Sequence, residues 1–294
     1  MLVGILGTGL IGSSVGLAAR AAGDDTFGWD GNGAAASEAA AIGALCAIGP
    51  SPEAVAAESD VVVVALPLAA TVELLARLPA SRHAGLVIDV ASVKQPVLTA
   101  AARVPYFVAS HPIAGSERRG PAAARRDLFS GRVWAYVPPR DRELEARARE
   151  FFKRLGATPV AVDAETHDRT VAFTSHLPQV VATALGASLA ERADDRVLRA
   201  LCGTGMLTMT RLALSSWTVW EGIFAANAAP VHEEVRAFAG ILGDTADAIR
   251  DGERGSLSHM FQRAAAGAAT LRENVGAPGL VIDGTERHQS RGSP

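Results

Sequence analysis

Three glycines near the start of the chain have the spacing of a diphosphate-binding turn. Gly7, Gly9 and Gly12 form G-x-G-x-x-G directly after the apolar run LVGIL and at the start of a helical run over residues 10–22. In this pattern the chain turns tightly, the backbone approaches a pyrophosphate, and the helix N-terminus supplies N–H groups and the positive end of its dipole. The motif therefore predicts a dinucleotide site. We expect the same site to include Leu10, Ile11, Leu66 and Pro67.

A carboxylate follows at the place expected for contact with the adenosine ribose. Asp30 ends the next strand-like run, 18 residues beyond Gly12. A carboxylate there accepts hydrogen bonds from ribose hydroxyls and repels a 2′-phosphate. Because Gly31, Asn32 and Gly33 follow and no Arg or Lys stands among them, the pattern favours NAD over NADP.

The same segment also matches a different catalytic motif. Residues 12–16 read G-x-S-x-G, the nucleophile elbow of α/β hydrolases, with Ser14 as the nucleophile. An elbow serine follows a central strand that several others precede, whereas Ser14 lies close to the N-terminus and within a helix that has already begun. Its position therefore argues against a hydrolase.

Two later segments place polar side chains where strands should end. They are DVASVK at residues 89–94 and SHPIAGSERRG at residues 110–120. Ligands of open α/β sheets bind at the carboxyl ends of the parallel strands. We therefore expect these segments to contribute to a site beside the dinucleotide.

The bulk composition limits the classes of function. The 294 residues are 49% hydrophobic and 20% charged, so the chain has enough hydrophobic residues to form a core. Its formal net charge of −3 lacks the excess of positive charge that is typical of proteins that bind nucleic acid. Cys46 and Cys202 stand apart without clustered histidines, which argues against disulfides and a metal site. No segment offers about 18 unbroken apolar residues, so we expect a cytoplasmic protein that is neither secreted nor membrane-spanning.

The first half of the sequence indicates an α/β domain. Short β-rich runs alternate with helical patterns up to about residue 162, which is typical of βαβ units in a doubly wound, mostly parallel sheet with helices on both faces. The strand runs are LVGIL, TFGW, DVVVVAL, GLVIDV, YFVAS, RVWAYV and TPVAV. Because DVVVVAL is continuously apolar, we place it in the interior of the sheet.

The second half is predicted to be helical. Strand-like runs stop after about residue 164, and apolar residues recur at intervals of three and four. We expect a domain of residues 1–163, a helical domain of residues 164–275 and a polar tail of residues 276–294. The Ala- and Leu-rich helices suggest burial against a second copy, hence a homodimer. The predicted helices cover about residues 165–192 with a kink at Pro178, 195–202, 217–250 and 256–273.

Five motifs together resemble one family of dehydrogenases. The segments LGTGLIGSS, DVASVK, HPIAGSE, TSHLP and TRLALSSWTVW occur in the order and spacing of the prephenate/arogenate dehydrogenases, over nearly the whole chain to about residue 275. The resemblance implies a Rossmann domain followed by an all-α dimerisation domain. It also implies an enzyme of tyrosine biosynthesis that converts prephenate to 4-hydroxyphenylpyruvate, arogenate to tyrosine, or both, by NAD-dependent oxidative decarboxylation.

The resemblance assigns roles to three residues. His111, in HPIAGSE, matches the histidine that takes the proton of the substrate hydroxyl, and Ser92, in DVASVK, matches the serine that orients it. Arg211, in TRLALSSW, matches the arginine that clamps a substrate carboxylate. Of the seven histidines only His111 and His176 fall within family motifs, and Lys94 is equally compatible with steering an anionic substrate and with facing water.

Further substrate contacts are implied near the same motifs. They are Gly115, Ser116, Ser175, His176 and Gln179. Gln179 replaces the second histidine of the motif SHLPH that many prephenate-specific relatives carry, and this difference favours arogenate without deciding between the substrates. Ser216 and Trp217 stand where an Asp-Pro pair is usual, which leaves open a role in substrate recognition or only in loop structure.

Three other functions stay open. A dehydrogenase for a 4-amino analogue of prephenate would share these motifs. A β-hydroxyacid or imine reductase of similar fold would use a catalytic lysine on the helix between the domains, but residues 165–192 contain none. A non-catalytic NAD-sensing protein would tolerate the loss of His111.

Overall fold

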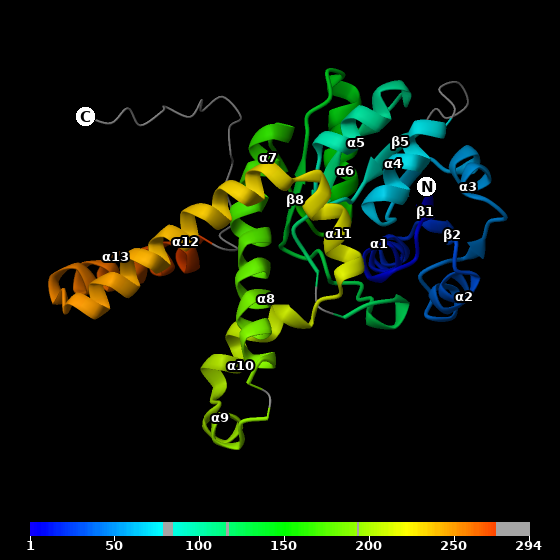
Figure 1. Ribbon diagram of the computed structural model, residues 1–294. Coiled ribbons are helices and arrows are strands. Elements are labelled where there is room, and N and C mark those ends of the chain that lie inside the picture. The colour runs from blue at the N-terminus through cyan, green and yellow to red at the C-terminus, as the bar shows by residue number, and fades with distance from the viewer. Residues whose placement is uncertain (79–84, 116–117, 193, 275–294) are drawn as a thin grey trace. The chain divides into compact units, whose positions relative to one another are not determined.

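The computed structural model describes residues 1–78, 85–115, 118–192 and 194–274. Its described residues fall into two compact units, one of residues 1–168 and 215–226 and the other of residues 169–214 and 227–274. The predicted polar tail lies outside the described residues, and the predicted domain limits stay a prediction. Figure 1 names the elements along the chain.

A six-stranded parallel sheet forms the centre of the first unit (Figure 1). Its strand order is β3-β2-β1-β4-β5-β6, so the order reverses between β1 and β4, which pair from Val3 with Val61 to Leu6 with Val64. This reversal is the point at which ligands bind in open α/β sheets. The strands are β1 (Leu2–Leu6), β2 (Asp25–Trp29), β3 (Ala47–Ile48), β4 (Val61–Val64), β5 (Leu86–Asp89) and β6 (Phe107–Val108).

Both faces of this sheet are covered. Val61 and Val63 of β4 belong to one apolar core and Val62 and Val64 to another, because successive side chains of a strand point to opposite faces. All four are buried, as predicted for the run DVVVVAL. The helices of this part are α1 (Leu10–Ala21), α2 (Gly33–Ala41), α3 (Pro52–Glu58), α4 (Leu68–Arg77), α5 (Gln95–Ala100) and α6 (Arg142–Arg154).

A second, three-stranded sheet carries the HPIAGSE motif. It consists of β7 (Ser110–Pro112), β8 (Val133–Tyr136) and β9 (Thr158–Ala161), in that order. β7 runs antiparallel to β8, with His111 opposite Ala135, so this region departs from the parallel pattern. Trp134 is fully buried and stacks on Phe152 of α6 with ring centroids 5.0 Å apart.

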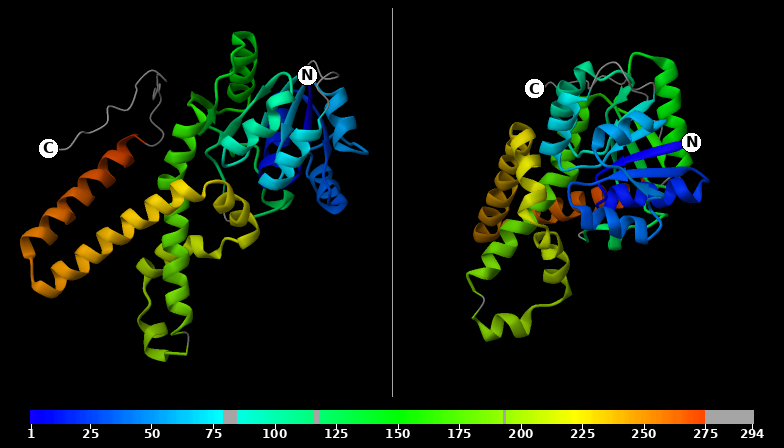
Figure 2. Two further views of the ribbon diagram at one scale, coloured as in Figure 1. Left: turned by 45° about the horizontal axis from the view of Figure 1, so that its top comes forward. Right: turned by 90° about the vertical axis from the view of Figure 1, so that its right-hand side faces the viewer.

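The second unit is helical, as predicted (Figure 2). The expected helix at 165–192 consists of α7 (Ala164–Val171), which spans the limit between the units, a π-helical segment (Ala172–His176) and α8 (Leu177–Ala190). Pro178 lies in the first turn of α8, where its missing N–H costs nothing, so the irregularity precedes the proline. The remaining elements are α9 (Arg196–Leu201), α10 (Thr204–Thr210), the 3₁₀ turn η4 (Arg211–Leu214), α12 (Ala228–Asp251) and α13 (Arg254–Asn274).

The expected long helix over 217–250 is interrupted. α11 (Trp217–Ala226) belongs to the first unit, and Asn227 separates it from α12 of the second. α12 and α13 then run antiparallel as a helical hairpin, joined by Gly252 in a left-handed conformation with φ 71° (Figure 2). None of the helices in the described ranges has both the length and the apolar character needed to cross a bilayer.

Candidate active site

The three glycines of the first motif have different local surroundings. Gly7 has a φ of +99°, and a Cβ there would lie 2.4 Å from the carbonyl oxygen of Ala65. A Cβ on Gly12 would lie 1.9 Å from the carbonyl oxygen of Gly7, so this glycine lets α1 pack on the turn. At Gly9, the residue before α1, no described atom lies within 4 Å of a Cβ position. The turn is therefore closely packed on the protein side and open where a diphosphate would approach.

The carboxylate of Asp30 lies directly beside this turn. Its Oδ2 accepts hydrogen bonds from the backbone N of Thr8 at 2.6 Å and from the Thr8 hydroxyl at 2.9 Å, and its Oδ1 accepts from the N of Asn32 at 2.8 Å. These donors hold the carboxylate at the end of β2. Asp30 remains half-buried, so it keeps a surface toward solvent or a ligand.

Ser14 does not have the surroundings of a hydrolase nucleophile. It lies within α1, is fully buried, and its Oγ accepts a hydrogen bond from the backbone N of Arg125 at 3.0 Å. A nucleophile must be reachable by substrate. The structure therefore agrees with the sequence argument against the G-x-S-x-G alternative.

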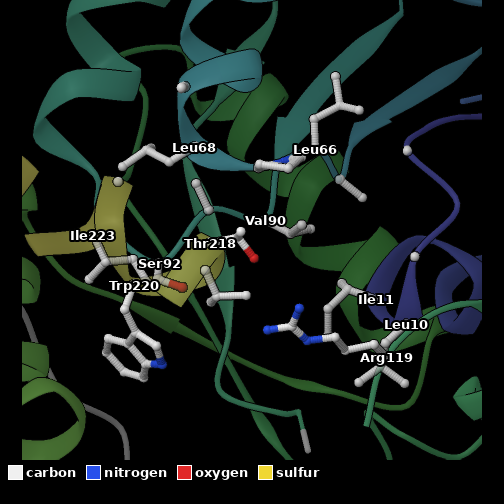
Figure 3. Close-up of a pocket in the computed structure, with 18 of the residues that line it drawn as sticks. Leu10, Ile11, Leu66, Leu68, Val90, Ser92, Arg119, Thr218, Trp220 and Ile223 are labelled. Atoms are coloured by element: carbon white, nitrogen blue, oxygen red, sulfur yellow. The ribbon is translucent and has the colours of Figure 1, made fainter. Parts of the chain in front are cut away.

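A cavity of about 820 Å³ opens at the glycine turn (Figure 3). Its volume is in the range of small-molecule and cofactor sites. α11 supplies one wall, including Trp220 and Ile223, and Leu68 of α4 lies nearby. Among the predicted site residues, the cavity brings together Gly7, Gly9, Leu10, Ile11, Asp30, Leu66, Pro67 and Ser92.

Two arginines that the sequence reasoning missed also line this cavity. Arg118 and Arg119 come from the segment after HPIAGSE, and Figure 3 shows the Arg119 guanidinium pointing into the cavity beside Leu10 and Ile11. Guanidinium groups suit phosphate oxygens. The sequence expectation that no cation stands near Asp30 considered only its neighbours along the chain, whereas the fold brings cations from residues 118–119 to the same cavity.

His111 is hydrogen-bonded to a second histidine. Its Nδ1 lies 3.0 Å from Nε2 of His167 on α7, and the ring centroids are 5.2 Å apart. Nδ1 of His167 lies 2.7 Å from Oδ1 of the neighbouring Asp168, and both residues are buried. His167 and Asp168 were not predicted site residues.

A buried ion pair holds the strand that carries His111. The Lys94 ammonium pairs with the carboxylate of Asp89 and donates to the carbonyl oxygen of Ser110. Burial lowers the pKa of Lys94, and the charges of Asp89 and Asp168 oppose that shift. Lys94 is only 1% exposed, so the interpretation that it faces water is wrong. It instead joins the end of β5 to β7.

The second unit contains the other predicted substrate contacts. His176 is buried, and its Nδ1 lies 3.3 Å from Nδ2 of Asn227, whereas Ser175 and Arg211 are exposed. Gln179 is also buried, and its Nε2 donates to the carbonyl oxygen of Leu212 at 2.9 Å. Its Oε1 is buried without a hydrogen-bond partner among the described residues. Gln179 therefore ties α8 to the turn that begins at Arg211.

Two further residues singled out from the sequence, Gly115 and Ser216, lie in a loop and at a helix start. Gly115 is exposed in the loop after β7, and Ser116 lies outside the described residues. Ser216 Oγ accepts from the backbone N of Thr218 at 3.3 Å and lies 2.8 Å from the Thr218 hydroxyl. Ser216 thus caps the start of α11, a structural reason for a serine at this position.

The glycine turn, the ribose-side carboxylate and the sheet reversal define a dinucleotide-binding oxidoreductase of the Rossmann class. Residues 15–161 match the family model for the nucleotide-binding domain of prephenate dehydrogenase, and residues 163–263 match the model for its dimerization domain. The chain therefore belongs to the prephenate dehydrogenase family.

Individual relatives agree with this assignment. The probable prephenate dehydrogenase NovF of Streptomyces niveus is 35% identical over 289 residues, which cover 93% of this chain and 78% of that protein. The prephenate dehydrogenase of Bacillus subtilis is 31% identical over 76% of this chain, and the match spans 63% of the relative's length. The solved prephenate dehydrogenase from A. aeolicus, in complex with hydroxyphenyl propionate and NAD⁺, superposes with a TM-score of 0.83 at 25% identity, over 92% of this chain and 98% of that one.

Proposed function

We propose that this protein catalyses the NAD-dependent oxidative decarboxylation of a cyclohexadienol, prephenate or arogenate, in tyrosine biosynthesis. The observation that carries the proposal is the cavity that unites the glycine turn and Asp30 with Ser92. Its similarity to proteins named as prephenate dehydrogenases supports the choice of reaction. The proposal places the enzyme in the cytoplasm.

The cavity has features that fit a nicotinamide dinucleotide. The open space at Gly9 and the N-terminus of α1 would hold the diphosphate, and Asp30 would accept from the ribose. Arg119 adds a positive charge at the same wall. When bound, NAD supplies the acceptor for the hydride that leaves C4 of the substrate ring.

Side chains of the protein would accept the proton of the substrate hydroxyl and bind a substrate carboxylate. His111 takes the proton of the C4 hydroxyl, Ser92 orients that hydroxyl, and Arg211 binds a substrate carboxylate. As hydride and proton leave C4 and its oxygen, the bond from the ring to its carboxylate breaks, carbon dioxide departs and the ring becomes aromatic. The gain of aromaticity drives the reaction forward.

Gln179 supports arogenate as the preferred substrate. Its buried Oε1 needs a hydrogen-bond donor, because a buried polar atom without a partner costs about 1–3 kcal/mol. The side chain of arogenate ends in an amino acid whose ammonium is a donor, whereas the keto acid of prephenate offers only acceptors.

We also propose that the chain forms a homodimer through its helical unit. The matching family model describes a dimerization domain, and several large apolar side chains of α12 and α13 are more than half exposed in the single chain. They are Ile241, Leu242, Ile249, Phe261 and Leu271. A second copy would remove this apolar surface from water.

A steady-state assay of prephenate and arogenate, each with NAD and NADP, tests the reaction. We expect turnover with NAD and a higher kcat/KM for arogenate. His111→Asn should lower kcat by about 10²- to 10⁴-fold, the usual contribution of a general base, while leaving substrate binding close to normal. Absence of turnover with both substrates in the wild type, or near-normal turnover in His111→Asn, would contradict the proposal.

A further inference from the structure

We infer that His167 and Asp168 are positioning residues that fix the protonation of His111, so that its Nε2 carries the lone pair a base requires. This inference rests on the proposed role of His111 as the base of the reaction. It follows from the hydrogen bonds that link the three side chains. All three residues belong to the first unit.

The chain of hydrogen bonds begins at a carboxylate that can only accept. Asp168 Oδ1 accepts from the backbone N of Lys94 at 2.8 Å, and Oδ2 accepts from the backbone N of Gln95 at 3.0 Å. Backbone N–H groups cannot change their role, so both oxygens face donors. Oδ1 of Asp168 therefore meets the ring of His167 as an acceptor.

The state of Asp168 determines the state of His167. Because Oδ1 of Asp168 only accepts, Nδ1 of His167, 2.7 Å away, must carry the proton. A neutral imidazole has one protonated and one unprotonated nitrogen. Nε2 of neutral His167 is consequently an acceptor, and it faces His111.

The same reasoning carries one residue further. Nδ1 of His111 lies 3.0 Å from the acceptor Nε2 of His167, so Nδ1 of His111 is the donor in this hydrogen bond. A neutral His111 then has its lone pair on Nε2. When Nε2 takes the substrate's proton, the O–H bond breaks, an N–H bond forms, and the hydrogen bond from Nδ1 to His167 strengthens because its donor is now charged.

The burial of the pair supports a positioning role. His167 and Asp168 are each 3% exposed, so water does not replace the missing partner when one of them is changed. The opposite tautomer of His111 would place two N–H groups or two lone pairs against each other. A ring held in one tautomer spends all of its time as a competent base, as in other sites where a carboxylate orients a catalytic imidazole.

The inference can be tested without substrate by nitrogen NMR on protein labelled at its histidines. The wild type should show His111 protonated on Nδ1 and unprotonated on Nε2, and His167 likewise. Asp168→Asn places an amide where the carboxylate stood and should raise the share of the opposite tautomer in His111. A wild-type His111 protonated on Nε2 overturns the inference, whether or not either cyclohexadienol is turned over.

Kinetics provide the second readout. Asp168→Asn should lower kcat by about 10²- to 10⁴-fold with little change in KM. His167→Gln retains a carbonyl acceptor for Nδ1 of His111 and should lose less activity than His167→Leu, even if Asp168→Asn fails to fold. Equal losses in these two His167 variants, or wild-type kcat in a folded Asp168→Asn, would contradict the positioning role.

The same helix offers a matched control. Asp163 accepts from the backbone N of Thr166 at the start of α7, so Asp163→Asn makes the same change of charge five residues from Asp168. Asparagine is also a good helix cap. This variant should keep the wild-type tautomer and kcat, which separates the effect of Asp168 from a general loss of helix stability.

Discussion

At the level of single residues, the roles of Gln179 and Lys94 could be inferred only in part from the sequence, because both depend on neighbouring side chains and backbone groups. Gln179 stood out from the sequence because it replaces a histidine, and the structure adds a buried oxygen that lacks a partner among the described residues. Lys94 follows Ser92 closely in the same motif, yet its ammonium is enclosed by Asp89 and Ser110. Its function is set by groups that the fold brings to it.

Substrate preference is expected to depend on Gln179. Gln179→His should shift the ratio of kcat/KM for arogenate over prephenate toward prephenate by about ten- to hundredfold, the range for a hydrogen bond to a charged group. The measurement is a parallel steady-state assay with both substrates.

Thr183→Val provides the control for this variant. Thr183 contacts Nε2 of Gln179 at 3.1 Å but leaves Oε1 unchanged, so its loss should not alter the ratio. If Gln179→His and Thr183→Val give the same ratio as the wild type, Gln179 does not select the substrate.

At the level of elements, two glycines of the turn between β1 and α1 have different roles. Gly9 leaves space for the diphosphate, and Gly12 allows α1 to pack on the turn. Gly9→Ala should leave thermal stability unchanged, since no described atom lies within 4 Å of the new Cβ, but should raise the KM for NAD about tenfold or more by filling the diphosphate space. Gly12→Ala pushes a Cβ against the Gly7 carbonyl and should also lower the free energy of unfolding by about 1–3 kcal/mol.

Thermal denaturation together with NAD titration distinguishes the two variants. A Gly9→Ala protein that loses stability, or one that binds NAD as the wild type does, would be inconsistent with open space at this position. A stable Gly12→Ala protein would show that α1 can move away from the turn.

Most elements were predictable because their signals are local. The seven strand runs all appear, and the periodic helical segments do as well. β3 was missed because its two residues, Ala47 and Ile48, do not stand within a longer β-rich run, and α10 because its Gly- and Thr-rich sequence has weak helix propensity. Pro230, in the first turn of α12, is the local signal of the break at Asn227, but the prediction continued the helix through it and so joined α11 and α12.

The candidate site was predictable only where its residues lie close together in the sequence. The glycine turn and Asp30 lie within about one βαβ unit, where spacing along the chain implies proximity. The contact between His111 and His167 joins residues 56 positions apart, and Arg119 reaches the glycine turn from a distant loop. Such contacts depend on how β7, α7 and β5 pack, and no short motif encodes that packing.

At the level of the whole molecule, the exposed apolar side chains of α12 and α13 predict self-association. Light scattering after size-exclusion chromatography should give twice the chain mass of 30.4 kDa. Ile241→Glu places a charge on the apolar side of α12 and should shift the equilibrium to monomer. Arg236→Glu changes the charge on the opposite side of the same helix and should leave the dimer intact. A monomeric wild type contradicts the proposed homodimer.

The position of Trp220 in the cavity wall also gives the protein an internal optical reporter. Tryptophan emission overlaps the absorption of reduced nicotinamide, so a reduced dinucleotide in the cavity would receive excitation energy from Trp220. Trp134, stacked on Phe152 and hydrogen-bonded to Ser110 beside His111, emits instead from an apolar interior. Occupancy of the cavity by the reduced cofactor can thus be followed through tryptophan fluorescence, without any added label.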